Sequence, residues 1–75
     1  MESMRYAIVI ERSSSGFGVY VPDLPGCVAA GETEEDARQL IREAIEAHLE
    51  GLREGGDPVP PPSSSVSYVD VPSAA

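Results

Sequence analysis

The chain has 75 residues, of which 41% are hydrophobic and 5% aromatic, so its length predicts one small domain. Its formal net charge is -8, and its basic residues are five arginines without a lysine. The negative field argues against direct binding of nucleic acid, and the absence of lysine excludes Schiff-base chemistry.

Two strands joined by a tight turn are predicted at the start of the chain. Residues 4–12 form a β-branched run that places Tyr6 and Ile8 on one face and Ala7 on the other. Residues 13–16 read Ser-Ser-Ser-Gly, which is typical of a turn. Alternation resumes over residues 17–21, so we expect an antiparallel hairpin.

A rigid corner is predicted after the hairpin. Its residues are Pro22, Asp23, Leu24, Pro25, Gly26 and Cys27. Each proline removes a backbone donor and fixes φ, so regular strand pairing must end here. Gly26 is able to take a positive φ, and Asp23 is expected to accept N–H groups from the residues that follow it. The apolar run 27–30 then predicts a third strand before Gly31.

One amphipathic helix is predicted over residues 34–54. Thr33 is a good N-cap, and the three acidic residues after it suit the positive end of the helix dipole. Apolar residues recur at spacings of three and four, namely Ala37, Leu40, Ile41, Ala44, Ile45, Leu49 and Leu52. Gly55 and Gly56 supply the stop.

A proline-serine connector over residues 57–65 is expected to be extended, because four of these residues are proline. Residues 66–71 alternate again and predict a last strand. The expected fold is therefore a single α+β domain over residues 1–75 in the order βββαβ, with the helix packed on one face of the sheet.

The other face of that sheet has no predicted cover. Its apolar residues, which form a candidate interface, are Ala7, Val9, Tyr20 and Tyr68. A chain this short buries only about 60% of its unfolded surface, so we expect a homo-oligomer, a dimer or higher. The alternative is a solvated face with scattered apolar residues.

The sequence resembles the HicB-like antitoxin family. The resemblance rests on the order of elements, the strand pattern of residues 5–10, the motif Val-Pro-Asp-Leu-Pro-Gly-Cys over 21–27, and Gly-Glu-Thr over 31–33. It implies a degenerate ribonuclease-H-like fold and neutralisation of a small basic HicA-type toxin that cleaves mRNA. Many members carry a C-terminal DNA-binding domain. The sequence reaches Ala75 without one, so we expect no operator binding.

Catalytic readings are weaker than structural ones. Cys27, the single cysteine, is expected to be a small buried hydrophobe, and His48, the single histidine, a packing or interface residue. With so few ligands we expect no metal and no cofactor. The acidic side chains of the helix lie mostly off its apolar stripe, and Glu11 with Asp70 does not make a two-metal site.

We therefore expect no enzyme. An antitoxin that occludes a toxin is the preferred function, followed by a stand-alone oligomeric domain of unassigned role and, last, a degenerate ribonuclease-H-like enzyme. After Met1 the sequence shows no signal-peptide pattern, and no apolar run approaches the ~20 residues that span a membrane. We expect a cytoplasmic protein.

Overall fold

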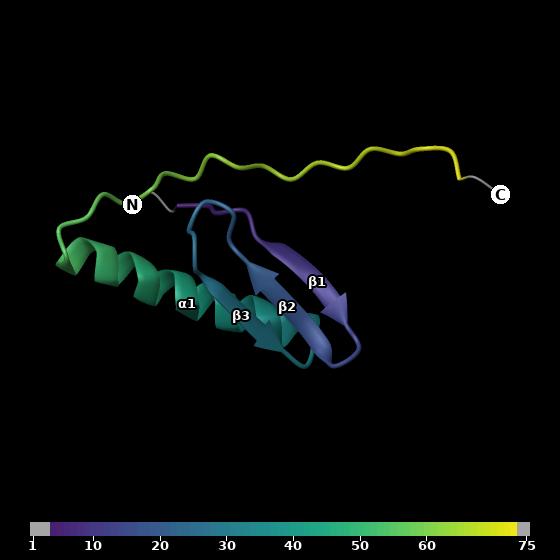
Figure 1. The fold of residues 1–75 in the computed structure, drawn as a ribbon, viewed down its shortest axis with the longest axis horizontal. Coiled ribbons are helices and arrows are strands. Elements are labelled where there is room, and N and C mark those ends of the chain that lie inside the picture. Colours follow the sequence, from purple (N-terminus) through teal and green to yellow (C-terminus); the bar gives the residue numbers. More distant parts are fainter. Residues whose placement is uncertain (1–3, 74–75) are drawn as a thin grey trace.

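A computed structural model describes residues 4–73 of the chain as three strands and one helix (Figure 1). The elements are β1 (Val9–Ser13), β2 (Gly16–Tyr20), β3 (Val28–Gly31) and α1 (Glu34–Glu54). The strands form one antiparallel sheet in the order β1-β2-β3, and α1 packs against β2 and β3 on one face. The expected α+β class, with one helix covering one face of the sheet, is confirmed.

The hairpin of β1 and β2 has a register that pairs Val9 with Tyr20 and Ser13 with Gly16. β1 begins later than the sequence predicts, since residues 4–8 lie outside the strand. The reason is that β2 turns into the proline corner after Tyr20, so residues 4–8 have no β2 residue opposite them.

Both ends of α1 are confirmed where the sequence predicts them. The Thr33 hydroxyl accepts the backbone N–H of Asp36 at 3.0 Å and caps the first turn. At the other end the N–H of Gly55 donates to the Gly51 carbonyl at 3.0 Å, and Gly56 takes a φ of +72° that ends the helix.

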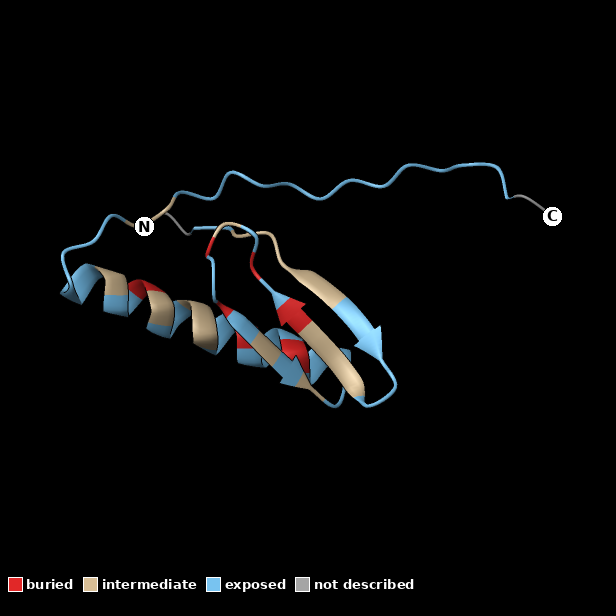
Figure 2. Cartoon of the chain, in the orientation of Figure 1, coloured by how far each residue is buried: buried red, intermediate tan, exposed pale blue. Residues whose placement is uncertain are grey.

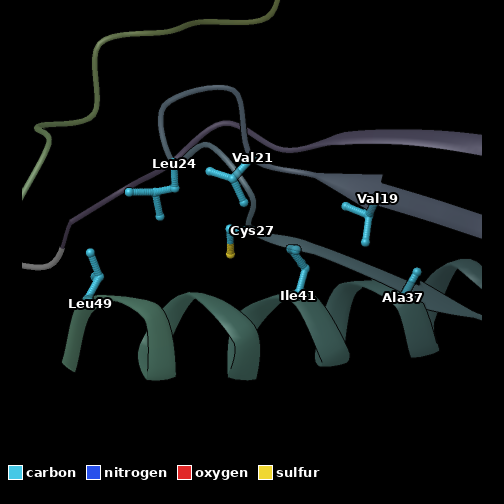
Figure 3. Packing of buried hydrophobic residues seen from close by; sticks show 7 residues of the cluster. All are labelled: Val19, Val21, Leu24, Cys27, Ala37, Ile41 and Leu49. Carbon is cyan, nitrogen blue, oxygen red and sulfur yellow. The ribbon is translucent and has the colours of Figure 1, made fainter. Parts of the chain in front are cut away.

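The core lies between α1, the end of β2 and the proline corner (Figure 3). Its buried side chains are Val19, Val21, Leu24, Cys27, Ala37, Ile41 and Leu49. Burying each larger aliphatic side chain stabilises the fold by roughly 1.5–3 kcal/mol. Cys27 is a free, buried thiol, as expected, and burial raises its pKa. The corner is therefore part of the core as well as a turn.

The predicted last strand over residues 66–71 is wrong for this structure, because this segment is extended but unpaired. Residues 66–73, here called the C-terminal arm, run away from the sheet and the helix and are exposed along their length (Figures 1 and 2). The exposed fractions are 55% for Val66, 90% for Tyr68, 84% for Val69 and 76% for Val71. The connector before the arm is held against the corner, as described below, and directs the arm outward. The order of the described elements is thus βββα, and the ribonuclease-H-like label stays a prediction.

Candidate binding surfaces

The proline corner closes on itself through three backbone hydrogen bonds. Leu24 N–H donates to the Val21 carbonyl, Cys27 N–H donates to the Leu24 carbonyl, and Val21 N–H donates to the Cys27 carbonyl, at 3.0–3.2 Å. Gly26 adopts a φ of +85°, the left-handed region that favours glycine. Leu24 is fully buried beneath this corner. The corner is therefore fixed in one conformation, and its outer side faces away from the core.

Asp23 lies on the outer side of the corner and binds the connector. Its carboxylate accepts the backbone N–H groups of Ser63 and Ser64 at 2.8 and 2.9 Å, and their hydroxyls at 3.1 and 2.7 Å. The expectation that Asp23 serves the N–H groups directly after it is thus wrong. The backbone N–H and C=O groups of the turn bond to one another. The Asp23 carboxylate is therefore free to accept hydrogen bonds from donors 40 residues away.

These hydrogen bonds favour the ionised form of Asp23 and lower its pKa from 3.8 to about 2, with the backbone N–H of Ser64 as the largest cause. A second attachment lies nearby, where the Tyr6 hydroxyl donates to the Pro60 carbonyl. Burial raises the pKa of Tyr6, and the Asp23 carboxylate adds to that rise. We call Tyr6, Asp23 and their partners Pro60, Ser63 and Ser64 the connector latch.

The face of the sheet opposite α1 carries an apolar row. The register places Val9 beside Tyr20 and Tyr20 beside Val28, so the three side chains form a row with one member on each strand. Tyr20 is 41% and Val28 is 64% exposed. Two members of the predicted interface therefore lie together. Val28 was not predicted to belong to this row, although the alternation of the third strand indicated which of its residues share a face.

The other two members of the predicted interface lie elsewhere. Ala7 is half-buried in the segment that leads into β1. Tyr68 is on the C-terminal arm and is not brought to the row. The predicted four-residue interface is thus not assembled within one described chain.

A groove of about 1190 Å³ runs between α1 and the segment before β1. Met4, Tyr6 and Ile8 line one side, while Ile41, Ile45 and Leu49 of α1 line the other. It opens there because α1 packs against β2 and β3 and leaves the β1 side of the sheet uncovered. The groove therefore offers apolar side chains in reach of a free strand edge.

Acidic side chains mark the solvent side of α1. The exposed members are Glu43, Glu46, Glu50 and Glu54, and three more carboxylates occupy the first turn. His48 is half-buried and lies one turn from Ala44 and Leu52, on the apolar side of α1. Within residues 4–73, no three of the His, Cys, Asp and Glu side chains are grouped to hold a metal ion. The described part of the chain has no helix with the length and apolar character needed to cross a membrane.

Comparison with known proteins gives a consistent picture. Residues 6–74 match the family described as the HicB-like antitoxin of bacterial toxin-antitoxin systems. An uncharacterized 14.9 kDa protein of Haemophilus phage HP1 is 39% identical over 92% of this chain. The chain spans about half of that relative, 52% of its length. A UPF0150 protein of Thermoplasma acidophilum is 38% identical over 76% of this chain and 84% of its own length.

Two further relatives carry names that describe toxin-antitoxin systems. The protein called Antitoxin HicB 2 of Photorhabdus laumondii is 28% identical over 97% of this chain and 53% of its own length. Among solved structures, a chain of a HicA3 and HicB3 toxin-antitoxin complex superposes with a TM-score of 0.68 and 40% identity. That match covers 79% of this chain and 70% of the solved one.

Proposed function

This chain belongs to the HicB-like antitoxin family of bacterial toxin-antitoxin systems, and we propose that it binds a small basic HicA-type toxin in the cytoplasm and occludes its mRNA-cleaving site. The observation that carries this proposal is the likeness to the solved HicA3 and HicB3 complex, at 40% identity and a TM-score of 0.68. The proposed role is binding and steric exclusion, without catalysis or a cofactor.

Charge supports this partner. The chain carries a net charge of -8, and Glu43, Glu46, Glu50 and Glu54 of α1 are exposed. An RNA-binding surface on a toxin is cationic, so opposite charges would steer the two proteins together. Screening shortens electrostatic reach to about 8 Å at physiological ionic strength, so association should slow as salt rises.

Matched charge variants test whether the solvent side of α1 faces the toxin. The first variant is Glu43→Lys with Glu50→Lys, on α1. The control is Glu11→Lys with Glu32→Lys, on β1 and in the loop before the helix; all four positions are exposed. Both pairs change the net charge equally, so a difference between them isolates the surface from the overall charge. Titration calorimetry against a HicA-type toxin encoded beside this chain is the measurement.

We expect the helix pair to weaken binding at least tenfold more than the control pair, which corresponds to about 1.4 kcal/mol. Equal losses would show that α1 is not the toxin-facing surface. No detectable binding by the unaltered chain would overturn the toxin proposal and favour the stand-alone oligomeric domain.

We also propose that the chain is a homo-oligomer. The exposed row of Val9, Tyr20 and Val28 supports self-association, and so does a core of only seven buried hydrophobic side chains among the described residues.

A further inference from the structure

The C-terminal arm has the composition of a strand but contacts nothing that would make it one. Val66, Tyr68, Val69 and Val71 are all more than half exposed. Asp70 is the only charged residue of the arm. β-Branched and aromatic residues at alternating positions suit a half-buried strand, and an exposed strand-like segment of low charge readily pairs with a free edge.

The connector latch fixes where the arm begins. Asp23 holds Ser63 and Ser64, and the Tyr6 hydroxyl donates to the Pro60 carbonyl. The arm leaves the molecule directly after these contacts and extends away from it (Figure 1). An arm presented in this way is positioned for a neighbouring molecule.

The same chain also has a free strand edge on β1, here called the acceptor edge, that is available to pair with the arm. β1 pairs only with β2 among the described strands, so its other edge presents unpaired N–H and C=O groups. The groove lies on the α1 side of this edge, with Ile8 and Ile45 in its lining. A strand added to β1 would place alternate side chains over that groove and the others on the opposite face. Val69 and Val71 share one such face, while Val66 and Tyr68 share the other.

Two further observations favour a second copy as the donor of that strand. Because every chain carries both the arm and the acceptor edge, a reciprocal exchange satisfies both and closes with twofold symmetry. The arm carries a single charge, Asp70, so it offers a cationic toxin little electrostatic attraction.

We propose that residues 66–71 of one copy form a strand along the free edge of β1 in a second copy, over the groove, in a reciprocal exchange that makes a dimer. On the outer face Val66 and Tyr68 would then join the row of Val9, Tyr20 and Val28. The dimer does not depend on the toxin proposal, since the chain alone contains both partners.

Light scattering on the full chain, without toxin, is the first test. We expect twice the chain mass of 7.9 kDa. Val69→Asp should halve the mass without unfolding the chain, because the Val69 side chain is 84% exposed in the single molecule. Leu40→Asp is the matched control on α1, where the side chain is 42% exposed and lies outside the groove lining, and should stay dimeric.

Hydrogen exchange of the arm amides is the second test. In the wild-type dimer, alternate amides of residues 66–71 should be protected, and Val69→Asp should remove this protection. A monomeric wild type, or a Val69→Asp variant that stays dimeric, would overturn the proposal. If both variants are monomeric, the wild-type amides decide between the outcomes. Protection of the arm amides from hydrogen exchange supports strand exchange, and unprotected arm amides overturn the proposal. Protection that arises only after addition of a HicA-type toxin would make the toxin the occupant and also overturn it.

Discussion

Ser64 is bound by both carboxylate oxygens of Asp23: its N–H donates to Oδ2 at 2.9 Å and its hydroxyl to Oδ1 at 2.7 Å. The two residues are 41 positions apart, with β3 and α1 between them in the chain order. This contact joins the rigid corner after β2 to the connector after α1. It therefore sets the point from which the C-terminal arm projects.

Acid should release the connector from Asp23. The folded-state pKa of about 2 lies below the ordinary value of 3.8, so the attachment is complete above pH 3.8 and is lost as pH falls through about 2. The Ser63 and Ser64 amide resonances, followed by NMR, should titrate with a midpoint near 2. Asp23→Asn removes the titrating group and should give a flat profile. A midpoint near 3.8 would show that the serines do not bind the carboxylate in solution.

Gly26→Val should destabilise the fold far more than Ser14→Val. Gly26 has a φ of +85°, which costs an L-residue with a side chain about 1–2 kcal/mol, whereas Ser14 is exposed in the turn between β1 and β2. No atom lies within 4 Å of a Cβ built at Gly26, so the loss reports conformation and not a clash. Thermal unfolding of both variants is the measurement. Equal melting temperatures would mean that the corner tolerates another backbone conformation.

A close approach between β3 and α1 makes a second glycine sensitive. A Cβ at Gly31 would lie 2.7 Å from the Ala37 backbone nitrogen and 2.9 Å from the Asp36 Cβ. A Cβ at Gly18, on β2, would meet nothing within 4 Å. We expect Gly31→Ala to lower the free energy of unfolding by roughly 1–3 kcal/mol, because the helix start must shift. Gly18→Ala is the matched control, and urea unfolding should leave it close to wild type; a wild-type-like Gly31→Ala would contradict the packing described here.

The features predicted correctly from the sequence are those that depend on neighbouring residues. α1 has both of its ends set by Thr33 and by the glycines after Glu54, which are local signals. The corner likewise follows from its own prolines and from Gly26.

The features missed depend on distant partners. Alternation over residues 66–71 shows that the segment suits a strand, but it does not say which edge, or which molecule, receives that strand. Asp23 was misassigned for a related reason, because its donors Ser63 and Ser64 are remote in the sequence. The row across the outer face was predicted in part, and Val28 joined it only once the register of β2 and β3 was known.

The most direct test of the antitoxin role is an RNA-cleavage assay with a HicA-type toxin encoded beside this chain. Increasing amounts of the purified chain should suppress cleavage in proportion to complex formed, and higher salt should weaken the suppression, because screening reduces the attraction of a chain with a net charge of -8. The chain alone should leave the RNA intact. Undiminished cleavage at low salt, with the chain in excess and folded, would contradict the account.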